Sequence, residues 1–273
     1  MTLADVPAAQ RADLLFSIEA ARVAGERVLG LRATGRWKDE PILADVGDQA
    51  ADGFLQGFVR GRYPGDGILS EETADSRARL AHERVWIIDP LDGTREYSQG
   101  RDDWAVHVAL AIDGKPALGA VALPAQGRIV WGVCQDGARL AGIEGSGTLT
   151  SGDSPSPTPA RIAVSRSHTP SWMPALATEL GAELVPCGSV GAKVALLLLG
   201  NADLYAHRKG LKEWDTCAPE VLACALGWFV SRLDGTPVPY NQENPNHDEF
   251  LVCRPAAREK LLGALQRAGA TRR

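Results

Sequence analysis

Two carboxylates stand three residues apart at the end of an apolar run. Val85–Ile88 predicts a strand covered on both faces, because four consecutive apolar residues suit such a position. Pro90 cannot donate to a strand ladder, so we expect the strand to end there. Asp89 and Asp92 would then lie close together and repel each other unless a hard divalent cation with oxygen ligands neutralises them. The spacing therefore predicts a metal site at a strand end.

The residues that follow these carboxylates are suited to phosphate. Gly93 and Thr94 offer free backbone N–H groups and a hydroxyl, as is typical where a helix N-terminus meets an anion. Arg95 adds a positive charge directly after them. Together with the carboxylates, this stretch predicts a metal-assisted phosphate site.

A second acidic pair, Glu71–Glu72, comes directly after the short apolar stretch 68–70. Adjacent glutamates on a surface are usually solvated. A position at the end of a predicted strand favours a role in the site instead. We expect Glu71 and Asp89 to end neighbouring strands on one rim of a sheet.

The C-terminal part of the chain offers further candidates. Asp215 opens a predicted helix over 214–226, where an aspartate is ordinarily a cap or a partner of the helix dipole. Arg208, Lys209 and Lys212 lie just upstream and would form a clamp if an anionic substrate bound beside them. Gly188–Ser189 precedes another predicted helix, which is a weak signal for an anion site and is typical of an ordinary N-cap.

The bulk composition limits the classes of function. The 273 residues carry a net charge of −5, so a broad nucleic-acid surface is not expected. Five scattered cysteines form no C-x-x-C pair, which gives no support for zinc or thioredoxin-like chemistry. We see neither a signal peptide nor an apolar stretch of the ~20 residues that span a bilayer. These features favour a cytoplasmic enzyme with reduced thiols and no membrane partner.

The periodicities predict an α/β protein of two halves. Residues 1–141 form an α+β half: a helix over 7–31, an irregular stretch over 36–48, a helix over 49–60 capped by Asp48, a short helix over 74–82, and an antiparallel meander over 104–141. A Gly-, Ser- and Pro-rich linker covers 142–160. Strands and helices alternate through 161–273, the α/β half. The histidines at 107, 168 and 207 are not spaced as a metal set, so we interpret them as structural or peripheral.

Taken together, Glu71–Glu72, the segment D-P-L-D-G-T at 89–94, and W-D-T-C-A-P-E from Trp214 resemble the inositol monophosphatase family. The three motifs occur in the family's order with similar separations, and the resemblance covers nearly the whole chain. It implies an alternating αβαβα sandwich and a magnesium-dependent, lithium-sensitive phosphatase. L-S-E-E, D-P-L-D-G-T-R-E-Y and S-R-L-D-G-T-P-V-P-Y-N-Q are similar to the bacterial 3′(2′),5′-bisphosphate nucleotidase branch. Such enzymes remove the 3′-phosphate of 3′-phosphoadenosine 5′-phosphate, a phosphorylated nucleotide formed as a by-product of sulfate assimilation.

The resemblance also implies roles for individual residues. The implied ligands of about two or three Mg²⁺ ions are Glu71, Asp89, Asp92, Asp215 and the Leu91 carbonyl. The implied catalytic set is Glu71, Asp92 and Thr94, in which Thr94 and Glu71 orient the attacking water. The implied substrate-binding set is Gly93, Thr94, Arg95, Gly188, Ser189, Lys193, Lys209 and Asp215. A homodimer is implied by resemblance only.

The chain departs from the family pattern before its second helix. The family usually has Pro-Val-Thr-x-Ala-Asp, whereas the segment 41–48 reads P-I-L-A-D-V-G-D, so the supporting carboxylate is either Asp45 or Asp48. Pro219 also replaces a glycine that often follows the Trp-Asp pair. Two residues separate Asp89 from Asp92, a spacing that does not match the Asp-x-Asp of haloacid-dehalogenase phosphatases. We therefore expect water, not an aspartate, to attack. Inositol or sugar phosphate hydrolysis and a non-catalytic metal- or nucleotide-binding regulator remain as alternatives.

Overall fold

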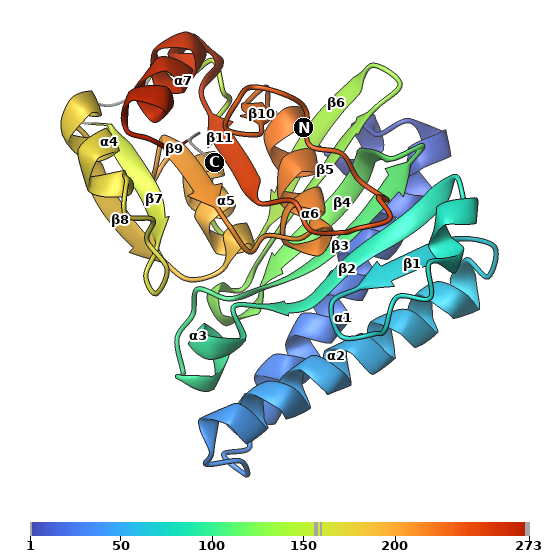
Figure 1. The fold of residues 1–273 in the computed structure, drawn as a ribbon. Coiled ribbons are helices and arrows are strands. Elements are labelled where there is room, and N and C mark those ends of the chain that lie inside the picture. Colours follow the sequence, from blue (N-terminus) through green and yellow to red (C-terminus); the bar gives the residue numbers. More distant parts are fainter. Residues whose placement is uncertain (1, 156–157, 159, 271–273) are drawn as a thin grey trace.

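The computed structural model describes residues 2–155, 158 and 160–270, which form five alternating layers of helix and sheet (Figure 1). Helices α1 (Ala8–Ala33) and α2 (Glu40–Arg62) cover one face of a six-stranded sheet. Helices α5 (Val190–Leu198) and α6 (Glu213–Ala225) lie between that sheet and a second, five-stranded sheet. Helices α4 (Met173–Leu180) and α7 (Arg258–Arg267) cover the outer face of the second sheet. The expected αβαβα sandwich is confirmed.

The first sheet carries the meander that the sequence predicts. Its strands follow chain order: β1 (Gly67–Ser70), β2 (Arg84–Asp92), β3 (Ala105–Ile112), β4 (Lys115–Leu123), β5 (Arg128–Gln135) and β6 (Ala138–Glu144). β1 pairs parallel to β2, and each later strand pairs antiparallel to the one before it. Asp113 and Gly114 turn between β3 and β4 with φ of 50° and 69°, the signs that a tight hairpin turn requires.

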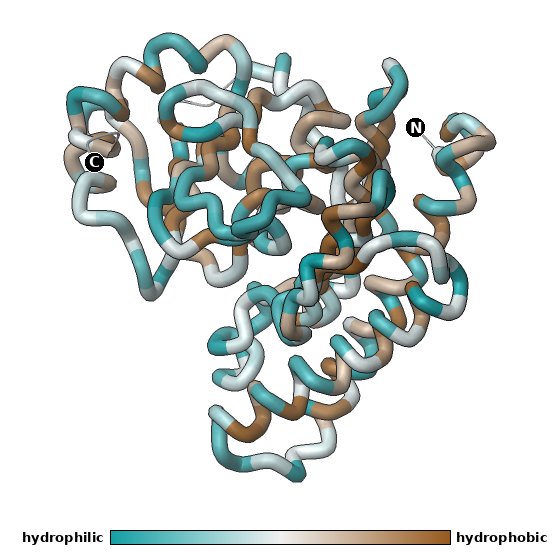
Figure 2. Tube along the Cα trace, turned by 45° about the vertical axis from the view of Figure 1, so that its right-hand side comes forward, coloured by the Kyte–Doolittle hydropathy of each residue, from teal (hydrophilic) through white to brown (hydrophobic). Residues whose placement is uncertain are grey.

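The second sheet has the order β10 (Phe229–Ser231), β11 (Glu249–Cys253), β9 (Leu204–Arg208), β7 (Arg161–Ser165), β8 (Glu183–Cys187). β7 pairs parallel to both β8 and β9, whereas β11 pairs antiparallel to both of its neighbours. Hydrophobic residues are concentrated at the centre of the molecule, and hydrophilic residues follow the outer loops (Figure 2). The strand–helix alternation predicted for 161–273 is present.

Three predicted boundaries are wrong. The second helix begins at Glu40 instead of residue 49, because Asp39 caps it by accepting the N–H of Ile42 at 3.1 Å, and Pro41 fits its first turn. Strand β2 does not end at Pro90 but continues to Asp92. A register shift between Asp89 and Asp92 relieves the ladder at the proline. The helix expected over 74–82 is reduced to a 3₁₀ turn, Ala78–Ala81.

The segment predicted as a linker is more closely integrated than its composition indicates. β6 extends into it as far as Glu144. Further on, the N–H of Thr150 donates to Leu198 O at 2.7 Å and that of Gly152 to Leu226 O at 2.9 Å. Residues 156, 157 and 159 of the predicted linker lie outside the described residues. Across the part of the chain that the structure describes, no helix has the length and apolarity needed to cross a membrane.

Candidate active site

The rim of the first sheet brings the acidic motifs together. β1 and β2 run parallel with Ser70 opposite Ile88, so Glu71 and Asp89 leave the same end of adjacent strands. The N–H of Glu71 donates to Ile88 O at 3.4 Å. The expectation that these two residues share a rim is confirmed, although Glu71 remains exposed and Asp89 is only 1% exposed.

The two aspartates of the central motif are both buried but have different partners. Asp89 Oδ1 accepts the N–H of Leu91 at 3.1 Å, whereas its Oδ2 has no hydrogen-bond partner among the described residues. Asp92 Oδ2 accepts the N–H of Gly191 at 2.8 Å and lies 3.0 Å from His107 Nε2. One ligand atom from each of Asp89, Asp92 and His107 lies within 4.8 Å of the others.

His107 corrects the sequence interpretation, which set it aside as structural or peripheral. Strand β3 pairs antiparallel with β2 so that His107 lies opposite Asp89, and its ring is fully buried in the site. Its Nδ1 lies 3.1 Å from Trp214 O, which can only accept a hydrogen bond, while Nε2 faces the Asp92 carboxylate. Burial lowers the pKa of His107, but the charge of Asp92 and the hydrogen bonds with Asp92 and Trp214 together outweigh that effect, so the net pKa is raised. His107 therefore connects the β2 carboxylate to the start of α6.

The carboxylates perturb one another's protonation. Burial, followed by the charges of Glu71 and Asp92, raises the pKa of Asp89 well above its usual value. Burial and the Asp92 charge raise the pKa of Asp215 to about 7, and desolvation and the Asp92 charge also raise that of Glu71. Burial alone would raise the pKa of Asp92, but the nearby His107 holds it below its usual range.

This pattern fits a hard divalent cation. A buried carboxylate oxygen without a partner, Asp89 Oδ2, is costly unless a ligand satisfies it. Its neighbours are further carboxylates, so a proton donor is less suited to the position than a cation that neutralises several of them. Oxygen donors of this kind favour magnesium, calcium or manganese over softer metals. The donor set therefore fits the metal that the motifs indicate.

The corrected start of α2 places Asp48 in the site. Asp48 is buried in the third turn of α2, whereas Asp45 is exposed. Burial, then the charges of Glu72 and Glu71, raise the pKa of Asp48 to about 8, against the opposing effect of the nearby Thr94 side chain. Asp48 Oδ1 is buried without a partner in the described part of the chain. Of the two carboxylates left open by the sequence, Asp48 is the one beside the acidic cluster.

The phosphate-type turn forms as expected. Gly93 has a φ of 89°, in the left-handed region that favours glycine, and immediately precedes the short helix α3 (Thr94–Ser98). Thr94 Oγ1 donates to Leu91 O at 3.2 Å. The Leu91 carbonyl therefore has one partner already and keeps a second lone pair for a ligand.

Asp215 combines the cap expected of it with a position in the site. Its Oδ2 accepts the N–H of Lys212 at 2.6 Å at the start of α6. The Lys212 ammonium lies 4.9 Å from the Trp214 ring centroid. Because Pro219 has no N–H, the Asp215 carbonyl also lacks the usual partner four residues along the helix.

Beside the carboxylates lies a cavity of about 480 Å³ that gathers most of the predicted substrate residues. Its lining includes Asp92, Gly93, Arg95, Gly188, Ser189, Lys193, Arg208 and Lys209. It also includes His168 and His207, which the sequence interpretation treated as peripheral. Lys193 is almost fully buried, whereas Arg95 and Lys209 are exposed. Cations thus surround the space next to the acidic cluster.

The Gly188–Ser189 pair has the ordinary N-cap role that the sequence favoured. Ser189 Oγ accepts the N–H of Ala192 at 2.9 Å, which caps α5. The N–H of Gly188 donates to Asp103 Oδ2 at 2.7 Å, so it is already engaged. Two residues after Ser189, Gly191 must be glycine because a Cβ there would collide with His107 Nε2. The start of α5 therefore packs directly on the acidic site.

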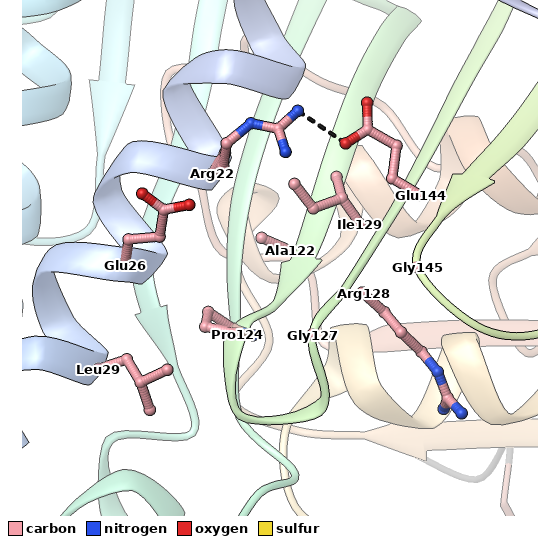
Figure 3. Close-up of a pocket in the computed structure, with 10 residues that line it drawn as sticks. All are labelled: Arg22, Glu26, Leu29, Ala122, Pro124, Gly127, Arg128, Ile129, Glu144 and Gly145. Carbon is pink, nitrogen blue, oxygen red and sulfur yellow. Dashed lines mark hydrogen bonds and ion pairs between the residues drawn. The ribbon is translucent and has the colours of Figure 1, made fainter. Parts of the chain in front are cut away.

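A second cavity, of about 280 Å³, lies between α1 and strands β4–β6 (Figure 3). Arg22 reaches across it to Glu144, and the two side chains pair at 2.7 Å. None of its lining residues belongs to the acidic cluster. The larger cavity beside Asp92 is therefore the candidate active site.

The fold and the site together define a family. The family model for the inositol monophosphatase family matches residues 10–270, and the chain belongs to this family. It is 41% identical over 250 residues to a protein of Mycobacterium tuberculosis named 3′-phosphoadenosine 5′-phosphate phosphatase, a match that covers 89% of each chain. A protein of the same name from Mycobacterium leprae is 39% identical and covers 94% of this chain and 95% of its own. The solved structure of CysQ from Bacteroides thetaiotaomicron aligns with a TM-score of 0.74 at 25% identity, covering 89% of this chain and 97% of that one.

Proposed function

We propose that this protein is a magnesium-dependent phosphatase that hydrolyses the 3′-phosphate of 3′-phosphoadenosine 5′-phosphate to AMP and phosphate. The observation that carries the proposal is the buried carboxylate cluster, with its unsatisfied Asp89 oxygen, beside a cation-lined cavity. The names of the two mycobacterial relatives support the same substrate. A cavity of about 480 Å³ also falls within the usual range for small-molecule sites.

The proposed metal ligands are Glu71, Asp89, Asp92, Asp215 and the Leu91 carbonyl, as the motifs imply. When bound, magnesium supplies Lewis-acid activation of water and neutralises charge on the transferring phosphoryl group. The protein holds the ligand side chains in place through other contacts. His107 and the Gly191 N–H fix Asp92, and the Leu91 N–H fixes Asp89.

Positioning of the phosphate and of the water falls to the start of α3. Left-handed Gly93 turns the chain into α3, and the first N–H groups of a helix have no intrahelical acceptor, so they can donate to phosphate oxygens. The Thr94 hydroxyl donates its proton to Leu91 O, so its lone pairs are left to accept from the attacking water. Asp48 lies near Thr94, and its Oδ1 has no partner among the described residues, so it is suited to hold that water or its proton.

The remaining phosphate and the nucleoside would occupy the cavity. Because the chain carries a net charge of −5, an anionic substrate needs locally placed cations. Arg95, Lys193 and Lys209 provide them from three different elements around the cavity. Lys193 donates to Gly188 O, which orients its ammonium within the lining.

The test is an Asp92→Asn variant assayed on 3′-phosphoadenosine 5′-phosphate and, in parallel, on inositol 1-phosphate. We expect a loss of about 100-fold or more in kcat/KM, because one ligand of the cluster is worth several kcal/mol of barrier. The control is Asp102→Asn, since Asp102 is exposed and lies outside the cavity lining. Near-normal turnover by Asp92→Asn would sink the assignment. A higher kcat/KM for inositol 1-phosphate in the unmodified enzyme would refute the substrate but keep the phosphatase class.

A further inference from the structure

Strand β9 presents two polar side chains to the cavity. Tyr205 and His207 are two residues apart, so they lie on the same face of the strand. Their neighbours Leu204 and Ala206 face the opposite way, into the core under α4 and α7. Tyr205 is 1% exposed and His207 is 9% exposed, and both line the cavity.

Both side chains carry a polar atom with no partner. Tyr205 Oη and His207 Nδ1 are buried without a hydrogen bond to any described residue. Leaving such atoms unsatisfied costs free energy, so each normally has a partner. Both residues line the substrate cavity, so a ligand bound there is a candidate for the missing partner.

The hydrogen-bonding capacity of His207 can be deduced from its other nitrogen. His207 Nε2 lies 3.0 Å from Lys209 O, and a carbonyl oxygen can only accept, so the proton is on Nε2. Burial, then the charge of Lys193, lowers the pKa of His207 to about 4, so the ring is neutral near pH 7. Nδ1 is therefore an acceptor and requires a ligand atom that donates.

This requirement excludes the phosphates as partners. A fully ionised phosphate group carries only acceptor oxygens, so it has nothing to donate to Nδ1. In 3′-phosphoadenosine 5′-phosphate the 3′ and 5′ oxygens are both esterified. The groups of its nucleoside that are able to donate are the ribose 2′-hydroxyl and the exocyclic amine of adenine.

We propose that His207 Nδ1 accepts a hydrogen bond from the nucleoside of the substrate, either the 2′-hydroxyl or the adenine amine, and so determines substrate specificity. The proposal rests on the proposed function, because it places a nucleotide in this cavity. It assigns His207 to recognition of the nucleoside, while Arg95 and Lys209 remain available for phosphate.

The experiment compares the substrate with two analogues, each of which lacks one of these two donors, the 2′-hydroxyl or the adenine amine. The kcat/KM is measured for 3′-phosphoadenosine 5′-phosphate, its 2′-deoxy analogue and its inosine analogue, which has no exocyclic amine. In the unmodified enzyme we expect one analogue to lose roughly 10- to 100-fold, because it leaves Nδ1 unpaired. In His207→Ala the penalty for that analogue disappears. In His207→Asn it largely returns, because the amide oxygen accepts close to the position of Nδ1.

Two further measurements keep the outcome clear. Binding of AMP, 2′-deoxy-AMP and IMP by calorimetry reads the same hydrogen bond without catalysis. The control variant is His82→Ala, since His82 lies outside the cavity lining and its ring Nδ1 contacts Gly65 O at 2.9 Å. The thermal midpoint of each variant reports whether it folds.

Equal penalties in the unmodified enzyme and His207→Ala, for turnover and for binding, would overturn the inference. No penalty for either analogue in the unmodified enzyme would overturn it as well. Failure to hydrolyse 3′-phosphoadenosine 5′-phosphate, with discrimination retained in the binding assay, would instead refute the proposed function and leave the role of His207 supported.

Discussion

Replacing Arg79 by alanine should both destabilise the protein and weaken its metal site. The Arg79 side chain is 1% exposed and pairs with Asp75 at 2.8 Å. It also donates to Asn241 Oδ1 at 2.7 Å and to Gln242 O at 2.8 Å. Removing one partner from a buried charge pair costs about 3–5 kcal/mol. Because Asp75 is 21% exposed and can rehydrate, we expect about 3 kcal/mol.

The effect on the metal site follows from what Arg79 connects. Glu213 accepts the N–H groups of Asn241 and Gln242 at 2.6 and 2.8 Å, and it stands two residues before Asp215. Arg79 itself belongs to the segment that follows Glu71. The Arg79 guanidinium thus connects the segment that follows Glu71 to the start of α6, which carries Asp215. Loss of this connection should raise the Mg²⁺ concentration needed for half-maximal activity by about 10-fold, which corresponds to about 1.4 kcal/mol.

The assay is urea unfolding together with a magnesium titration of phosphatase activity. Arg77→Ala is a matched control, because Arg77 pairs with Glu243 between the same two segments but the two side chains are 61% and 72% exposed. An exposed pair of this kind contributes less than about 1 kcal/mol. If Arg77→Ala and Arg79→Ala shift stability and the magnesium requirement equally, the reasoning is refuted.

Two further predictions concern buried carboxylates. Asp89→Asn should stabilise the metal-free protein by about 1–2 kcal/mol, because it removes a buried charge from the repulsive cluster. The same variant should lose the rise in Tm that Mg²⁺ causes in the unmodified protein. A Tm that still rises with Mg²⁺ would contradict this. Burial raises the pKa of Glu220 from 4.5 to about 7, so the folded state holds this proton more tightly than the unfolded state, and stability is lost as pH rises from 4.5 to 7. Glu220→Gln retains an acceptor for Tyr240. Relative to the unmodified protein, its free energy of unfolding by urea should increase by up to about 3 kcal/mol between pH 5 and pH 8. An equal change of unfolding free energy with pH in both proteins would count against this prediction.

Much of the fold could be predicted from the sequence because apolar periodicity controls most of its elements. Helices α1 and α6 begin and end within two residues of the bounds predicted for them, 7–31 and 214–226. The start of α2 was missed although its signals were present. Asp39 as a cap and Pro41 in the first turn are typical of a helix start, but the polar stretch over 36–48 obscured them.

The acidic motifs could be assigned because each one follows an apolar strand or opens a helix. His107 could not be assigned in this way, since its contact with Asp92 depends on the pairing of β2 with β3 and on the approach of α6. The choice between Asp45 and Asp48 likewise depended on which face of α2 turns inward, and the misplaced helix start hid that face. Whether His107 and Asp48 belong to the site is therefore determined by contacts between residues far apart in the sequence, which the local pattern does not reveal.

Helix α6 has a consequence for how the chain folds. It belongs to the C-terminal half in sequence, yet Gly132 of β5 packs against its residues Leu222 and Ala225, and its side chains share one apolar cluster with both sheets. Neither half can complete that core without the other, so the contacts that stabilise α6 are long-range and form late. We expect amide hydrogen exchange in α6 and in β3–β5 to occur through the same global opening. Two fragments separated within residues 142–160 would then have to associate before either one became fully protected.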